Sequence, residues 1–227
     1  TANAPIRFAV LPGSGARWGG ITINGSASSP ETRIAYAHFE GNSNTCLQVS
    51  GGTIYLAHSS FGTTDRTYLS LDGASFLVTH CSFPSGSAGF ELVHGTGGIK
   101  AGGRGIIRNC FFGKPVGYND VIDFTGGNRN YSQPILQLYQ NVFTGATDDV
   151  LDLDGTDAWI EGNLFLHCHR NGAPDSSSAI SGGSSGPDTS EVTVIGNLFF
   201  DCDHVATAKE GNFYTFLNNT MVRITQV

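Results

Sequence analysis

The chain of 227 residues is long enough for one sizeable core or for one elongated array of repeats. Glycine supplies 31 residues, whereas charged residues make up only 14% of the chain, and this combination of many tight turns with few helix-surface residues indicates an all-β protein. The formal net charge of −7 without any basic run argues against a nucleic-acid partner, and no stretch approaches the roughly 20 apolar residues of a membrane span.

Short apolar segments that end in or beside a glycine recur along the chain, and we predict that each is a strand. They are residues 21–26, 47–52, 68–74, 90–95, 121–127, 150–155, 179–183 and 205–211. Within 150–155, alternation sends Leu151 and Leu153 inward and Asp152 and Asp154 outward. The predicted strands therefore present a polar outer face.

A second motif, apolar residues followed by Asn-x-Phe, recurs in looser forms with a base spacing of 22 residues. Its last residue falls at Phe39, Phe61, Phe83, Phe111, Phe143, Phe165, Phe199 and Met221. Two residues earlier, the later repeats carry Asn109, Asn141, Asn163, Asn197 and Asn219. A constant spacing interrupted by insertions is typical of stacked coils with loops at one corner.

These in-phase asparagines and aromatics resemble the right-handed parallel β-helix of pectate-lyase-like proteins, over nearly the whole chain. The resemblance implies one domain, residues 1–227, of about eight right-handed coils. Each coil is too small to bury its own apolar face, but stacking at about 4.8 Å pairs every backbone group with the coils above and below. The resemblance also implies a secreted or cell-surface protein whose partner is a polysaccharide.

Stacking in this register places acidic segments on adjacent coils. Asp120 and Asp123 precede Asp149 and Asp152 by one coil, and Asp148 lies beside them. Like charges this close repel or raise one another's pKa unless a cation holds them, and hard oxygen ligands suit Ca²⁺. The alternative is that aspartate favours the turn entering a strand, which explains Asp148 and Asp149 but not the outward Asp152 and Asp154.

The same register predicts two rows of outward side chains that run across the coils. One row holds Gln48, Ser70, Glu91, Asp123, Asp152, Ser181 and Thr207, and the next holds Ser50, Asp72, Val93, Thr125, Asp154, Gly183 and Lys209. Two coils of stacking would separate Lys209 from Asp152 by roughly 10 Å.

The segment DDVLD, residues 148–152, resembles the carboxylate motif of calcium-dependent pectate lyases, in which another acid lies on the preceding coil. The resemblance implies Ca²⁺ as a cofactor and a lysine on the same face as the base that removes the proton α to a uronate carboxylate. Lys209 matches that role, with Asp154 as a substrate-binding candidate. The alternative is a surface lysine paired with Asp154 or Glu210.

Histidine and aspartate pairs are predicted to stack near this face. His167 and His169 share a face, as do Asp201 and Asp203 one coil later. Such contacts orient a general base, ligate a transition metal or form a hydrogen-bonded surface ladder. On the first interpretation His169 is a catalytic candidate, and His167 a substrate-binding candidate.

Three further features have two interpretations each. Arg170 either clamps a substrate carboxylate, as a catalytic-site candidate, or is a solvated loop arginine. Trp159 is either a sugar platform or an interior packing residue. The five cysteines lack a C-x-x-C pair, so we expect buried thiols, with a disulfide as the alternative only for Cys168 and Cys202, which are predicted to stack.

Two classes of function fit these observations. The first is a Ca²⁺-assisted lyase of uronate-containing polysaccharide, and the second is a non-catalytic carbohydrate-binding or surface-display module. A glycosidase fits less well, because the paired acids offer no separate acid and base positions.

Since PIRFAV and MVRITQV, near the two ends, have the pattern of strands, we also expect flanking domains or another chain to cover the end coils.

Overall fold

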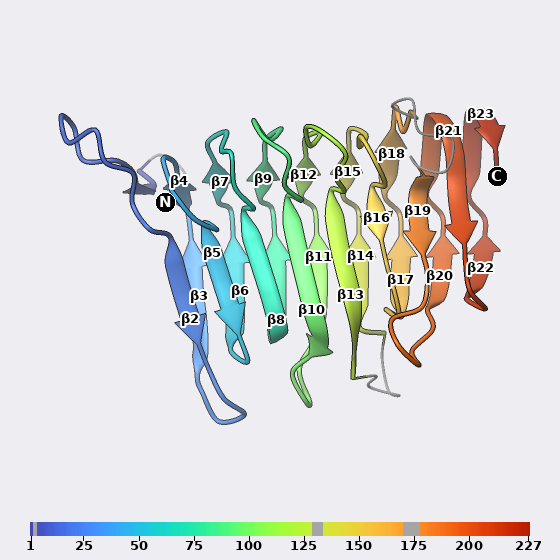
Figure 1. Ribbon diagram of the computed structural model, residues 1–227, viewed down its shortest axis with the longest axis horizontal. Coiled ribbons are helices and arrows are strands. Elements are labelled where there is room, and N and C mark those ends of the chain that lie inside the picture. The colour runs from blue at the N-terminus through green and yellow to red at the C-terminus, as the bar shows by residue number, and fades with distance from the viewer. Residues whose placement is uncertain (2–3, 129–133, 170–177) are drawn as a thin grey trace.

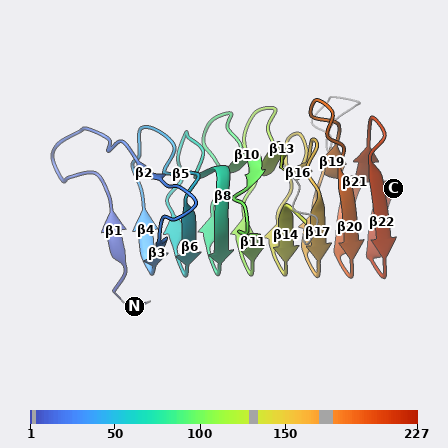
Figure 2. The same ribbon diagram turned by 90° about the horizontal axis from the view of Figure 1, so that it is seen from below.

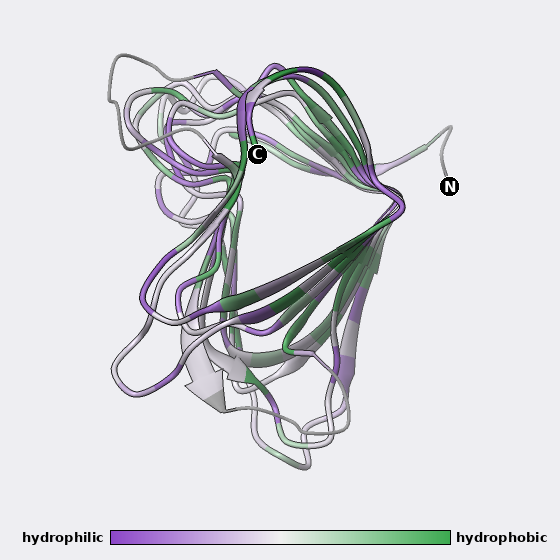
Figure 3. Cartoon of the chain, turned by 90° about the vertical axis from the view of Figure 1, so that its right-hand side faces the viewer, coloured by the Kyte–Doolittle hydropathy of each residue, from purple (hydrophilic) through white to green (hydrophobic). Residues whose placement is uncertain are grey.

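The computed structural model describes residues 1, 4–128, 134–169 and 178–227. Within these ranges the regular structure consists of strands alone, which pair in parallel from coil to coil. The coils stack along the long axis from the N-terminus to the C-terminus (Figures 1 and 2), and the view along the stack shows a three-sided outline (Figure 3). The predicted parallel β-solenoid of about eight coils is confirmed.

Each side of the solenoid is one parallel sheet. The phenylalanine sheet contains β1 (Ile6–Phe8), β4 (Ala37–Phe39), β7 (Ser60–Phe61), β9 (Ser82–Phe83), β12 (Phe111–Phe112), β15 (Val142–Phe143), β18 (Leu164–Leu166), the first part of β21 (Leu198–Ala208) and β23 (Thr220–Gln226). The acidic sheet contains β2 (Ile21–Asn24), β5 (Leu47–Ser50), the first part of β8 (Leu69–Thr79), β10 (Val93–Ile99), β13 (Ile122–Asn128), β16 (Leu151–Asp152), β19 (Ser178–Gly182) and the last part of β21. The third sheet contains β3 (Glu31–Ala35), β6 (Thr53–Ala57), the last part of β8, β11 (Gly105–Arg108), β14 (Leu136–Tyr139), β17 (Ala158–Glu161), β20 (Glu191–Ile195) and β22 (Phe213–Leu217).

A column of stacked phenylalanines fills the interior behind the phenylalanine sheet. Its members are Phe8, Phe39, Phe61, Phe83, Phe112, Phe143, Phe165 and Phe199. Successive ring centroids between Phe83 and Phe199 lie 4.8–5.0 Å apart, close to the spacing of adjacent parallel strands. The predicted column was wrong at one coil, where Phe112 is buried and Phe111 is 44% exposed.

An asparagine ladder runs beside the phenylalanines and explains that one-residue error. The backbone N–H of Cys110 donates to Asn141 Oδ1 at 3.0 Å, and Asn141, Asn163 and Asn197 repeat this contact with the asparagine of the following coil. Cys110 therefore occupies the ladder position predicted for Asn109. Asn109 instead adopts a φ of 52° in the bend, as other residues do directly before the ladder. Asparagine tolerates this left-handed conformation better than most residues.

The register of the acidic sheet agrees with the predicted rows except on the coil that contains β10. Val93 pairs with Leu69 and Ile122 and points inward, whereas His94 pairs with Ser70 and Asp123. His94 thus takes the place predicted for Glu91, and Thr96 takes the place predicted for Val93. The local pattern misled because Leu92 and Val93 are adjacent and both buried.

Two further expectations concern the cysteines and the membrane. All five cysteines lie in the described ranges and are buried free thiols, so Cys168 and Cys202 stack without a disulfide. The part of the chain that the structure describes contains no helix of the length and apolarity that a membrane crossing requires.

Candidate functional site

Three carboxylates gather where two adjacent coils enter the acidic sheet. Asp120 lies just before β13, and Asp148 and Asp149 lie just before β16. One oxygen from each of these residues lies within 4.8 Å of the others. Asp123 pairs with Asp152 in the same register. Acids from two coils therefore crowd together, as the spacing predicted.

Two of these carboxylates also bind the backbone of the next coil. The N–H of Asp149 donates to Asp120 Oδ1 at 2.8 Å, and the N–H of Ser178 donates to Asp149 Oδ1 at 2.7 Å. The arrangement is the same as in the asparagine ladder, with a carboxylate in place of an amide. These bonds use only the Oδ1 atom of each carboxylate, so the Oδ2 atom takes no part in the ladder.

Burial makes ionisation of these acids unfavourable. Desolvation raises the pKa of Asp120 to about 9, and repulsion from the neighbouring aspartates acts in the same direction. Burial likewise raises the pKa of Asp149 to about 6 and that of Asp152 to about 7. In addition, Asp152 Oδ1 is buried and accepts no hydrogen bond from the described residues. Without a counter-ion, the cluster is therefore partly protonated at neutral pH.

Lys209 lies at the end of the acidic sheet, two coils beyond Asp152. The register runs from Asp152 through Ser181 to Thr207, and Lys209 follows β21 directly. Its charge lowers the pKa of Asp149 and Asp152, although the effect of burial on both is larger. The side chain is exposed, and a hollow of about 430 Å³ lies beside it. The hollow is lined by His204, Ala206, Thr207, Ala208, Lys209 and Gln226.

The three gathered carboxylates fit a calcium ion. One oxygen from each of Asp120, Asp148 and Asp149 lies within 4.8 Å of the others, so all three could lie about 2.4 Å from one Ca²⁺ ion. A divalent cation would also balance the charge that burial makes unfavourable. These three residues would therefore hold the ion, with the unpartnered oxygen of Asp152 beside them.

Asp123 and Asp154 extend the negative surface but have other partners. Asp123 Oδ2 lies 3.1 Å from His94 Nδ1, and its Oδ1 accepts a hydrogen bond from Thr125 Oγ1 at 3.0 Å. The hydrogen bond with Asp123 raises the pKa of His94. Asp154 Oδ1 accepts the N–H of Gly183 at 2.5 Å. Neither residue is in the group of three whose oxygens converge.

Sequence reasoning missed three residues around the acids, namely His94, Ser178 and Tyr214. Besides its N–H contact with Asp149, Ser178 forms a hydroxyl contact with Thr207 at 2.6 Å. The Tyr214 hydroxyl is buried against Gly182, where a Cβ atom would have no room, and it has no hydrogen-bond partner among the described residues. Gly182 within a strand is the sequence sign of this close approach, but no pattern identifies the tyrosine.

The other candidate residues lie at different places on the solenoid. His167 and Asp201 form a contact of 2.8 Å at the bend between the phenylalanine and acidic sheets, so these two residues stack on adjacent coils as the spacing predicted. Trp159 lies in β17 of the third sheet, where its indole N–H donates to Glu161 Oε2 at 2.8 Å. It is therefore on a different sheet from the acids. Arg170 lies outside the described residues.

No protein-family model, curated protein or solved structure matches this chain. The fold is defined by the strand pairing of the chain itself. The chemistry of the acidic site rests on its buried carboxylates and the neighbouring lysine.

Proposed function

We propose that the acidic site binds Ca²⁺ and that the protein is a calcium-assisted lyase of uronate-containing polysaccharide, acting outside the cell or at its surface. One observation carries the proposal: carboxylates from two adjacent coils converge in a partly buried cluster, with an exposed lysine on the same sheet. Each element has a role in β-elimination. The acids provide a cation site, and the lysine provides an amine beside a hollow open to substrate.

The residues that would hold Ca²⁺ are Asp120, Asp148 and Asp149. When bound, the ion supplies a positive charge that binds the uronate carboxylate and stabilises the negative charge that develops on it. The Lys209 amine, in its neutral form, takes the proton α to that carboxylate. The electrons of the broken C–H bond form a carbon–carbon double bond, the glycosidic C–O bond at the adjacent carbon breaks, and the departing oxygen takes a proton from solvent.

The shape of the surface supports a polymeric substrate. The row of side chains that contains Asp152 runs across the coils through the buried Ser181 to the half-buried Thr207, and the exposed Lys209 follows two residues later. A chain of sugars lying along this direction would contact the cation site and the lysine at the same time. The hollow beside Lys209 adds space for a sugar ring at the C-terminal end of this path.

The experiment measures the ultraviolet absorbance of the conjugated double bond that β-elimination leaves. The protein is incubated with polygalacturonate, alginate and glucuronate-rich polymers, with calcium or with chelator. We expect calcium-dependent absorbance on one of them. Lys209→Ala and Asp152→Asn should each abolish it, because one removes the base and the other weakens the acidic site. Matched controls are Lys100→Ala, whose amine contacts Thr53 instead, and Asp72→Asn on an earlier coil of the same sheet.

The outcomes separate the lyase from its alternatives. Absence of absorbance on every polymer, with slowed migration of the protein in a gel that contains one of them, would replace the lyase by a carbohydrate-binding module. Activity that survives both substitutions would place the chemistry elsewhere, and His169 would be the next residue to test. Activity lost in the control variants as well would show a general loss of structure.

A further inference from the structure

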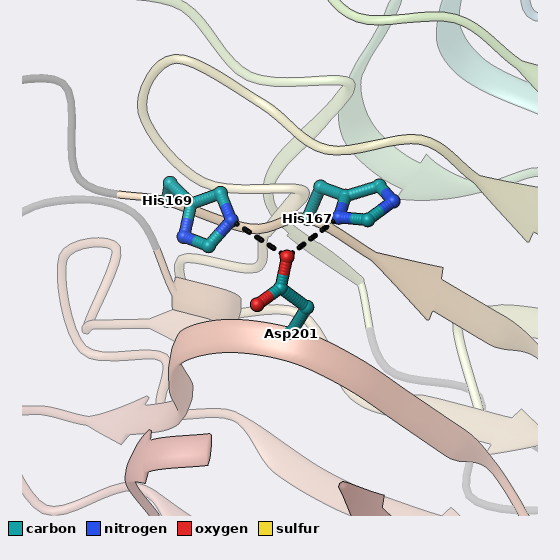
Figure 4. Close-up of side chains that lie close together, drawn as sticks. All are labelled: His167, His169 and Asp201. Carbon is teal, nitrogen blue, oxygen red and sulfur yellow. Dashed lines mark hydrogen bonds and ion pairs between the residues drawn. The ribbon is translucent and has the colours of Figure 1, made fainter. Parts of the chain in front are cut away.

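A second group of ligand atoms lies at the bend that follows β18, and it contains nitrogen as well as oxygen. His167 Nδ1 lies 2.8 Å and His169 Nε2 3.2 Å from the same atom, Asp201 Oδ2. All three ligand atoms lie within 4.8 Å of one another. Figure 4 shows both imidazole rings turned toward this one carboxylate oxygen. From this convergence we propose that His167, His169 and Asp201 form a binding site for a divalent transition metal of the Zn²⁺ class.

The donor set selects the class of metal. Imidazole nitrogen suits Zn²⁺ and its first-row neighbours, whereas Ca²⁺ takes oxygen ligands. Ligand atoms around a tetrahedral zinc ion, at about 2.0–2.1 Å from it, are about 3.3 Å apart. The contact of His169 with Asp201 already has this length, and that of His167 would open by about 0.5 Å. The two histidine side chains are about half exposed, so they can make this movement.

Asp203 orients one of the two rings. Its Oδ1 lies 3.4 Å from His169 Nδ1, on the opposite side of the ring from Asp201. A carboxylate that accepts the proton of one ring nitrogen leaves the lone pair of the other nitrogen free for a metal, as in the carboxylate–histidine–zinc arrangement. Without a metal, the lone pair of His169 Nε2 would face the negatively charged Oδ2 of Asp201, and the two would repel each other. A cation bound between the two atoms would remove this repulsion.

The local charge also favours a cation. Asp201 and Asp203 bring two negative charges, and Arg223 brings one positive charge, with its Nε 4.0 Å from the other oxygen of Asp201. The balance is one negative charge with neutral histidines. Three protein ligands leave at least one position for water or a substrate oxygen, and the exposed side chains leave that position open to solvent.

Titration with Zn²⁺ alone by calorimetry, and with Co²⁺ by visible absorption, tests the proposal. We expect one metal ion per protein molecule to bind at His167, His169 and Asp201. The affinity for this ion should fall at least about tenfold in His169→Ala and in Asp203→Asn. His167→Asn and Asp201→Asn suit the two bend positions, because both have positive φ and asparagine adopts it readily. Retained melting temperatures show that these variants are folded.

Two controls separate this site from other ligands of the chain. His38→Ala removes a histidine near the N-terminal end that contacts Ser60, and Asp149→Asn alters the acidic site. Neither should change the cluster-dependent equivalent of Zn²⁺. The proposal is overturned if neither metal binds, or if binding is unchanged in the four cluster variants. In that case the contacts are a hydrogen-bonded ladder of histidine and aspartate.

Discussion

At the scale of single residues, the aspartates of the acidic site combine a structural contact with an unfavourable charge. Asp120 accepts a backbone N–H from the next coil, which an asparagine would do equally well. Its carboxylate differs from an amide in that it lacks an N–H₂ donor and can ionise, and burial opposes that ionisation. At another edge of the same solenoid, the uncharged side chain of Asn163 accepts the backbone N–H of Asn141 in the same way. An acid at this position is explained by a cation, or by a proton, that offsets its charge.

This difference predicts how the metal-free protein responds to pH. The pKa values of Asp149, Asp152 and Asp120 are raised to about 6, 7 and 9 in the folded chain, whereas an unfolded aspartate titrates near 3.9. The folded state therefore keeps protons that the unfolded state releases. Their stabilising effect is complete below the unfolded value and is lost as pH rises through about 6 to 9. We expect the free energy of unfolding in chelator to fall between about pH 5 and pH 9.

Denaturant unfolding across this pH range measures the effect, with Asp120→Asn as the matched variant. Asparagine retains the ladder acceptor and cannot ionise, so the variant should have the shallower slope. His94 also has a raised pKa and contributes a slope of the same sign. Because His94 is present in both the wild type and Asp120→Asn, its contribution cancels when the two slopes are compared. A wild-type stability that is constant or rises over this range would contradict the prediction.

At the scale of the strand and its bend, one residue decides which side chain enters the core. β12 contains two adjacent phenylalanines, of which Phe112 stacks between Phe83 and Phe143 while Phe111 faces outward. The left-handed residue at Asn109 sets this phase, because the ladder position begins directly after it. The bend therefore fixes the register of the strand that follows.

Truncation of each phenylalanine tests this register. Phe112→Ala should lower the free energy of unfolding by about 3–5 kcal/mol, as expected for a buried aromatic that leaves a cavity. Phe111→Ala should cost less than about 1 kcal/mol, because the side chain is 44% exposed and outside the column. Thermal or denaturant unfolding of the two variants provides the comparison. Equal losses, or a larger loss for Phe111→Ala, would restore the register expected from the sequence.

Periodicity predicts strands well where each coil has one unambiguous inward pattern, and less well where apolar residues are adjacent. The 22-residue spacing identified the column at Phe143 and Phe165 because β15 and β18 each contain a single aromatic residue. It failed at Phe111 and again at Val93, where a neighbouring apolar residue competes for the inward position. The pairing of Asp123 with Asp152 was predictable because alternation within 150–155 is regular. The approach of Tyr214 to Gly182 was not, since it depends on a side chain that crosses the interior from another sheet.

At the scale of the whole molecule, stability is distributed along the stack. In a solenoid each coil contacts only its neighbours, so the total is close to a sum of coil and interface contributions. The interface between β13 and β16 joins a coil that carries Asp120 to one that carries Asp148 and Asp149. Repulsion among these acids weakens that interface when they ionise. An ion bound by acids from both coils would instead join them.

Calcium should therefore stabilise the protein, and it should do so first at this interface. At a free concentration about 100 times the dissociation constant, binding to the folded state alone adds about 2.7 kcal/mol, or roughly 5–10 °C in melting temperature for a chain of this size. Hydrogen exchange should show the largest gain in protection for the amides of Asp149 and Ser178, which donate to the two ladder carboxylates. The gain should increase with pH, since fewer protons then compete for the acids.

Two variants test where the ion binds. Asp149→Asn should remove most of the stabilisation by calcium, while Asp72→Asn on an earlier coil should leave that stabilisation intact. Identical melting curves in calcium and in chelator would show that protons, and not a metal, offset the charge of these carboxylates.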